Sequence, residues 1–288
     1  MSKKLIEPFQ KDDVFLQDLR RQPQSEDQWR MWWLGQSGFL IQWNQQYCLL
    51  DPYLSDSLTK KYHHTDKPHI RMTERVINPY RLDCIDVATS SHNHTDHLDA
   101  ETLIPIMQVN PTMKLMIPEA NRSFVINRLQ CDSSRLFGLT NGTEVEVDGF
   151  RFFGIPAAHE KLETDEQGQH RYMGYIISFG SWCFYHSGDT ILYDGMVEHL
   201  QQWSIDVALL PINGRMAERR VAGNLNGNEA AQLAKEIGAK IVIPCHYDMF
   251  TFNTASPDAF VTECHQLHQK YYVMQNGEGI TSEILHLQ

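Results

Sequence analysis

Four side chains that can bind metal ions fall within six residues, in the order His-Asn-His-Thr-Asp-His over residues 92–97. Imidazole and carboxylate groups are the ligands preferred by Zn²⁺ and neighbouring first-row ions. In an extended loop, side chains two positions apart point the same way, so His92 and His94 would face one point and Asp96 and His97 a second. A mostly apolar run at residues 84–88 precedes the loop and indicates a buried strand. One short loop at a strand end is therefore predicted to hold two metal ions.

Three further strand-like runs lead into a histidine or an aspartate. Residues 150–158 end at His159, residues 182–186 are followed by Ser-Gly and Asp189, and residues 240–245 end at His246. Ligand sites in α/β folds gather at the ends of strands, so the four loops are expected to share one edge. Each of these residues taken singly has a structural alternative, as a hydrogen-bonded histidine or a turn aspartate. Their combination predicts a common metal site.

The order of these motifs, H-x-H-x-D-H, then His, then Gly-Asp, then His, resembles the metallo-β-lactamase superfamily over most of the chain. Four blocks narrow the resemblance: WWLGQSGF at residues 32–39, LDPY at 50–53, SGDT at 187–190 and PCHYD at 244–248. They are similar to the branch that includes the bacterial L-ascorbate-6-phosphate lactonase. The resemblance implies an α/β fold with a four-layer αββα sandwich.

The resemblance also implies two divalent transition-metal ions and a distribution of their ligands. The seven predicted ligands are His92, His94 and His159 for one ion, Asp96, His97 and His246 for the other, and Asp189 as the bridge. A carboxylate can bridge because it has two oxygens, whereas a neutral imidazole binds one ion. Asp96 and Asp189 are the predicted catalytic residues, and a loosely held Asp96 would alternatively carry a proton. Zn or Mn is the favoured metal, and Fe is compatible with the same ligands.

The activity implied by this resemblance is that of a metal-dependent hydrolase. Two ions about 3.5–4 Å apart can share a water and lower its pKa toward neutrality, and the bridging hydroxide would attack a carbonyl or phosphorus. A lactone or ester of a small substrate, such as a phosphorylated sugar, is the favoured prediction. A phosphodiesterase of the same fold is the alternative. A non-catalytic metal-binding protein is a further alternative, against which the complete ligand set counts.

Other residues are candidates for supporting roles. Asp51 and Asp248 would accept hydrogen bonds from metal-bound histidines, or serve only as turn or cap residues. Arg215 and Asn213 follow a predicted strand at residues 207–211, so Arg215 is expected to bind an anionic substrate group through two hydrogen bonds; the alternative is an ordinary surface arginine. Weaker candidates for the same role are Arg71, His69, Lys61 and Tyr193.

Composition limits the partners of the 288-residue chain. A net charge of −11 argues against a nucleic-acid partner, since phosphate binding needs a basic surface. No apolar stretch is long enough to span a bilayer, the N-terminus lacks a signal-peptide core, and the six cysteines contain no C-x-x-C pair. We therefore predict a cytoplasmic protein that acts on a small molecule and has neither nucleic-acid nor membrane partners. A homo-oligomer remains open.

No composition break or linker divides the chain, which predicts a single domain over residues 1–288 with a short N-terminal helical extension at about residues 1–28. A helix is expected over residues 11–22, hairpins over 30–43, 144–155 and 172–186, and helices over 100–109, 119–129, 228–237 and 257–271. Residues 55–80 are the most basic window of this acidic chain and show little periodicity. Such a long loop in a compact domain is usually functional or disordered.

Overall fold

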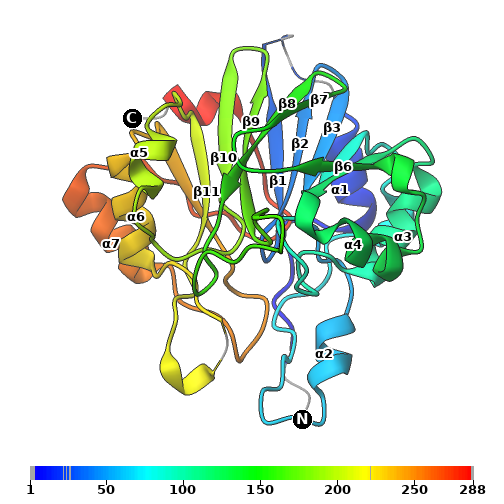
Figure 1. Ribbon diagram of the computed structural model, residues 1–288, viewed down its shortest axis with the longest axis horizontal. Helices are drawn as coiled ribbons and strands as arrows, with labels where there is room; N and C mark the ends of the chain where they lie inside the picture. The colour runs from blue at the N-terminus through cyan, green and yellow to red at the C-terminus, as the bar shows by residue number, and fades with distance from the viewer. Residues whose placement is uncertain (1–3, 22, 24, 26, 221, 287–288) are drawn as a thin grey trace.

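Two β-sheets lie face to face in the computed structural model, which describes residues 4–286 except 22, 24, 26 and 221 (Figure 1). The first has the strand order β13-β1-β2-β3-β4-β5-β6. Its strands are β1 (Arg30–Gly35), β2 (Gly38–Trp43), β3 (Gln46–Leu50), β4 (Val87–Thr89), β5 (Lys114–Pro118), β6 (Leu136–Leu139) and β13 (Gly279–Thr281). The second has the order β12-β11-β10-β9-β8-β7. Its strands are β7 (Glu144–Val147), β8 (Phe150–Pro156), β9 (Met173–Phe179), β10 (Trp182–His186), β11 (Val207–Pro211) and β12 (Ile241–Cys245).

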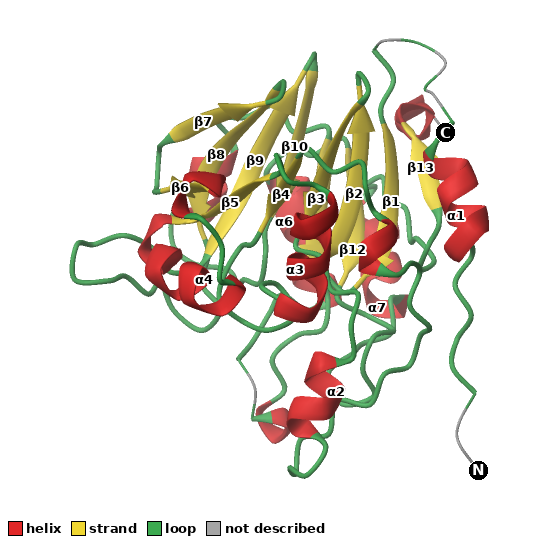
Figure 2. Cartoon of the chain, turned by 90° about the vertical axis from the view of Figure 1, so that its right-hand side faces the viewer, coloured by secondary structure: helices red, strands yellow, loops and turns green. Residues whose placement is uncertain are grey.

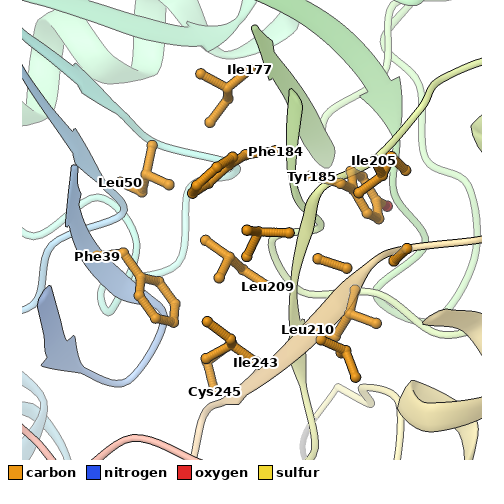
Figure 3. Close-up of a cluster of buried hydrophobic side chains, with 14 of the residues drawn as sticks. Phe39, Leu50, Ile177, Phe184, Tyr185, Ile205, Leu209, Leu210, Ile243 and Cys245 are labelled. Carbon is orange, nitrogen blue, oxygen red and sulfur yellow. The ribbon is translucent and has the colours of Figure 1, made fainter. Parts of the chain in front are cut away.

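The main core fills the space between the two sheets. Phe39 of the first sheet faces Phe184 and Leu209 of the second, and all three side chains are fully buried (Figure 3). Because successive strand residues point to opposite faces, the adjacent Trp32 and Trp33 divide between two cores. Trp33 belongs to the core between the sheets, while Trp32 lies on the outer face of the first sheet.

Helices cover the outer face of each sheet (Figure 1). On the first sheet lie α1 (Asp12–Leu19), α3 (Ala100–Val109) and α4 (Arg122–Leu129); on the second lie α5 (Met196–Leu200), α6 (Gly227–Glu236) and α7 (Asp258–Leu267). Phe15 of α1 packs against Trp32 with the two rings 6.3 Å apart. This helix–sheet–sheet–helix arrangement confirms the predicted four-layer sandwich. None of the described helices is long and apolar enough to cross a bilayer.

The strands that precede the site loops end at a common edge of each sheet. In the first sheet β1 and β3 both run antiparallel to β2, and β4 runs parallel to β3. In the second, β8 and β10 both run antiparallel to β9, and β11 and β12 run parallel to β10. Parallel strands deliver the loops after them to the same edge. This topology is why loops far apart in sequence meet.

Several of the expected elements differ in the structure. The helix predicted over residues 119–129 begins with the 3₁₀ turn η2 (Glu119–Asn121) before α4, and the helix predicted over residues 257–271 ends at Leu267. The N-terminal helix is α1, shorter than the predicted range of residues 11–22, whose last residue lies outside the described chain. The basic window at residues 55–80 is ordered by the short helix α2 (Ser57–Tyr62) and ends near the 3₁₀ turn η1 (Pro79–Arg81). Helix α2 projects below the sandwich, and so does the loop that carries η4 (Ala217–Arg219) (Figures 1 and 2).

Candidate metal centre

The structure brings all seven predicted metal-binding side chains together at the common strand edge. Their ligand atoms form three sets, and within each set all the atoms lie within 4.8 Å of one another. The sets are His92, His94 and His159; His92, His97 and Asp189; and Asp96, His97 and His246. Asp189 lies between the sets. Its Oδ1 is 3.2 Å from Nε2 of His97, a predicted ligand of one ion, and its Oδ2 is 3.5 Å from Nε2 of His159, a predicted ligand of the other. This is the position that a bridging carboxylate requires.

The turn before Asp189 depends on a glycine. Gly188 has a φ of +59°, and a Cβ there would lie 2.5 Å from Cβ of Ser91. A side chain would therefore strain the backbone and collide with the loop that carries His92. His246 also has a positive φ, +67°, which is uncommon for a residue with a side chain. Its backbone N–H donates to the carbonyl of Gln36 at 2.9 Å, which helps to hold this conformation.

Several buried atoms of the centre lack partners. Nε2 of His92 has no hydrogen-bond partner among the described residues, and Nε2 of His97 and Oδ1 of Asp189 are 3.2 Å apart without forming a hydrogen bond to each other or to another described group. Buried polar atoms are almost always hydrogen-bonded. Three such atoms without hydrogen bonds, all directed at one place, therefore indicate that a bound group contacts them there. Imidazole nitrogens and carboxylate oxygens are suitable ligands for divalent transition metals. The residues present therefore fit the metal ions that the sequence predicts.

The charges of the centre are strongly coupled. Burial lowers the pKa of His92 well below its usual value, and burial together with nearby His159 lowers the pKa of His94 to about 4. For His97, burial opposes protonation, but the carboxylates of Asp189 and Asp96 raise its pKa well above the usual value. The pKa of His246 is raised to about 9 against the same effect of burial, mainly by Asp189. The two carboxylates thus attract protons to His97 and His246 where a metal cation is absent.

The outer nitrogens of three imidazoles are held by hydrogen bonds. Nδ1 of His97 is 2.8 Å from Oδ2 of Asp51, Nδ1 of His159 is 2.8 Å from the carbonyl of Gly223, and Nδ1 of His92 is 3.0 Å from Oγ of Ser91. Each contact leaves Nε2 free to face the centre. Such contacts fix the orientation and tautomer of metal-binding histidines.

Of the two supporting aspartates proposed from sequence, the structure places only Asp51 beside a histidine. Asp51 also accepts hydrogen bonds from Ser91 N at 3.0 Å and from Thr89 Oγ1 at 2.7 Å, so its carboxylate ties β3 to the metal loop. Asp248 instead lies in a turn with a φ of +54°, and its backbone N–H donates to Thr254. It is the turn residue that the sequence left as the alternative.

Gln36 is a part of the centre that sequence reasoning missed. Its Nε2 donates to Oδ2 of Asp96 at 2.7 Å and lies 3.0 Å from Nε2 of His246. Its Oε1 is buried and has no hydrogen-bond partner within the described chain. The only sequence signal was its place between two glycines in a tight turn after β1.

Arg215, Asn213 and Arg71, the predicted substrate-binding residues, do not line the cavity at the metal centre and make contacts within the protein. The guanidinium of Arg215 makes two 2.6 Å contacts with the carboxylate of Glu229, which also caps α6. Asn213 is buried and donates to Asn253 at 2.9 Å. Arg71 is buried and donates to the carbonyls of Thr73 and Ser55, both at 2.7 Å. Arg215 and Asn213 are thus engaged by other side chains, whereas Nη2 of Arg71 is buried without a hydrogen-bond partner among the described residues.

A cavity of about 500 Å³ opens onto the metal centre. His94, Asp96, His159, Asp189 and His246 line its inner end. Of the weaker candidates from the sequence, Lys61 and His69 line it, whereas the hydroxyl of Tyr193 donates to the carbonyl of Pro156 at 2.6 Å. The basic window at residues 55–80 therefore contributes to the wall of the cavity.

Comparisons with known proteins agree with this architecture. A family model described as a β-lactamase superfamily domain matches residues 30–246. A UPF0173 metal-dependent hydrolase from Alkaliphilus metalliredigens is 30% identical over 234 residues, 79% of this chain and 89% of the relative. Another, from Sulfolobus acidocaldarius, is 26% identical over 253 residues, 86% of this chain and 97% of the relative.

Solved structures show the same fold. A metallo hydrolase from Ignicoccus hospitalis superposes with a TM-score of 0.64 at 22% identity, covering 88% of this chain and 98% of that chain. A metallo-β-lactamase fold protein from Bacillus subtilis has a TM-score of 0.64 at 17% identity, covering 89% and 100%. The family match begins with β1 and ends at His246, so it includes every predicted ligand. The chain belongs to the metallo-β-lactamase superfamily, among relatives named as metal-dependent hydrolases.

Proposed function

We propose that the seven clustered side chains hold two divalent metal ions and that the protein uses them to hydrolyse a lactone or ester of a small molecule. The observation that supports this most directly is the set of orphaned atoms on His92, His97 and Asp189, which converge where the cavity meets the strand edge. Zn and Mn remain the favoured metals, with Fe compatible with the same ligands.

When bound, two such ions activate a water and polarise the electrophilic oxygen of a substrate. The chain's own residues supply orientation and proton transfer. Asp51 holds the ring of His97, and Gln36 holds the carboxylate of Asp96. Asp96 lines the cavity with a side chain that is 14% exposed, so it is placed to pass a proton between the site and a leaving group.

The cavity offers neither of the two commonest side-chain nucleophiles. Of the described residues that line it, none is a serine or a cysteine, and the hydroxyl of Thr95 has no general base beside it in the described chain, where its hydrogen-bond contact is Nζ of Lys61 at 3.4 Å. Cys245, which precedes His246, is fully buried, and burial raises the pKa of its thiol well above the usual value. A thiol that stays protonated is a poor nucleophile. The chemistry therefore rests on an activated water.

A phosphodiesterase is the second candidate, favoured by the cations that line the cavity. The volume of about 500 Å³ suits a small molecule, and the net charge of −11 argues against a nucleic-acid strand. We also propose a cytoplasmic location, because all six cysteines are unpaired and reducing compartments keep thiols free.

The test is turnover by metal-loaded protein. Samples reconstituted with Zn²⁺ or Mn²⁺ are assayed against lactones, sugar-phosphate lactones, carboxylic esters and phosphodiesters, with Asp189→Ala as the negative control. Hydrolysis of a lactone or ester that requires metal and Asp189 supports the proposal. Preferential cleavage of phosphodiesters selects the second candidate. Tight metal binding with no turnover of any class would identify a non-catalytic metal-binding protein.

A further inference from the structure

The cavity is lined by cations in a chain that is acidic overall. Lys61, Lys67, Arg128 and Arg220 line it, although the net charge of the protein is −11. Asp96 and Asp189 are the only described carboxylates in the lining, and both belong to the candidate metal centre. Away from the metal centre, the lining therefore carries positive charge alone.

Arg128 is the most constrained of these cations. It lies in the last turn of α4, and its Nη1 donates to the carbonyl of Asn93 at 2.7 Å and to that of Leu98 at 3.3 Å. Its guanidinium stacks on the ring of Phe124, 4.4 Å from the centroid, and Phe124 also lines the cavity. Because Asn93 separates His92 from His94, Arg128 is attached directly to the metal loop.

The remaining donors of Arg128 are available. Within the described chain, its Nε and Nη2 have no hydrogen-bond acceptor, and no carboxylate forms an ion pair with it. Burial lowers the pKa of Arg128 somewhat, but an arginine stays charged at neutral pH. A fixed guanidinium with a free pair of N–H groups matches the geometry of a phosphate or carboxylate.

Lys61 and Lys67 add two charges without carboxylate partners. Nζ of Lys61 lies 3.4 Å from Oγ1 of Thr95, and Nζ of Lys67 donates to the carbonyl of Arg220. Neither lysine forms an ion pair with any described residue. Arg220 differs, because its guanidinium is paired with Asp66.

Neighbouring cations that do not line the cavity are paired. Lys60, next to Lys61 on α2, contacts Glu101 at 2.7 Å, and Arg122 on α4 contacts Glu119 at 2.7 Å. Carboxylates are thus present on the same surfaces, yet none forms an ion pair with Lys61 or Arg128 among the described residues.

We infer that Arg128, with Lys61 and Lys67, forms a subsite for an anionic group of the substrate, a phosphate or a carboxylate, beside the metal centre. The inference builds on the proposed function, since it describes the substrate of that same cavity. Arg128 would orient the anionic group through hydrogen bonds from its Nε and Nη2, and the two lysines would attract the group through their positive charge. The anion is a recognition group, separate from the bond that is hydrolysed.

Binding is tested by calorimetry on zinc-loaded protein with three matched probes: glycerol 3-phosphate, glycerate and glycerol. The two anions are expected to bind and neutral glycerol not to bind. The variants Arg128→Ala and Lys61→Ala/Lys67→Ala should weaken anion binding by roughly ten- to hundred-fold. Lys60→Ala removes one charge outside the cavity from α2, the helix that carries Lys61, and should leave binding within about two-fold.

A second experiment distinguishes anion binding at the subsite from anion binding to the metal ions. Asp189→Ala should retain most of the anion affinity, because it disturbs the metal centre and not Arg128. Binding lost in Asp189→Ala but unchanged in the arginine and lysine variants would place the anion on the metals and overturn the subsite. The double lysine variant keeps the test decisive if Arg128→Ala does not fold, since both lysines sit on the surface segment around α2. Calorimetry needs no turnover, so failure of the hydrolase assay and failure of anion binding are distinguishable.

Discussion

Nδ1 of His97 lies 2.8 Å from Oδ2 of Asp51, and both side chains are completely buried. The aspartate follows β3 and the histidine follows β4, so this contact joins two neighbouring strands of the first sheet through the candidate metal centre. It also fixes which nitrogen of His97 carries a proton, leaving Nε2 to face the centre.

Asp51→Asn tests this contact. The amide keeps the shape of the side chain but loses the charge that orients the ring, and such outer contacts contribute about 10- to 100-fold in metal affinity. We expect a loss in that range for one of the two ions, measured by competition with a chelator of known affinity. Asp248→Asn is the matched control, because Asp248 does not contact a histidine. Equal affinities in the two variants would remove Asp51 from the metal centre.

Metal content tests the ligand assignment as a whole. Protein purified without chelator is expected to carry up to two transition-metal ions per chain, as measured by elemental analysis. Asp189→Ala should lower the occupancy of both, because its two oxygens lie beside His97 and His159, which belong to different predicted sites. Thermal unfolding of the metal-free variant should match that of metal-free wild type. An unchanged metal content would show that Asp189 is only a turn residue.

Metal binding should release protons. The pKa of His97 is raised well above its usual value and that of His246 to about 9, so both rings are protonated at pH 7 in the metal-free protein. An imidazole must be neutral to bind a metal, so affinity rises as the pH increases toward 9. Calorimetry in two buffers with different ionisation enthalpies counts the protons released. A heat that is independent of the buffer would contradict this protonation state.

Arg215→Ala should leave activity nearly unchanged. The arginine is 46% exposed and pairs with Glu229, so its loss should cost less than about 1 kcal/mol of unfolding free energy in urea denaturation. The value of kcat/KM should stay within about two-fold for charged and uncharged substrates. A ten-fold loss confined to anionic substrates would restore the role that its sequence position suggested.

The sequence predicted which side chains meet at the strand edge, because each candidate metal ligand lies in a short loop after a strand. There, the identity of the residue and the parallel course of the strands determine where it lies. Substrate contacts were not predictable in this way. Which arginine is available to a substrate depends on the groups that lie nearby in three dimensions: Arg215 is paired with Glu229, whereas Arg128 lines the cavity and donates to the backbone carbonyl of Asn93.

Gln36 shows a second limit. A glutamine is an unusual neighbour for metal-binding residues, so its residue type gave no signal. The tight turn after β1 carries it beside Asp96, which lies 60 residues further along the chain. The basic window at residues 55–80 differs from Gln36, because its charge is evident from the sequence. Its helix α2 was not predicted, since the hydrophobic residues in this window show only weak periodicity.

The projecting segments around α2 and η4 meet through Arg220, which pairs with Asp66 and accepts a hydrogen bond from Lys67. Neither segment belongs to a sheet, whereas the metal centre is built on strand ends. Arg128, in contrast, lies on α4 and is hydrogen-bonded to the loop that carries His92 and His94. Exchange of the two projecting segments is therefore expected to change the charge around the mouth of the cavity while leaving in place the strand ends that carry the candidate metal ligands.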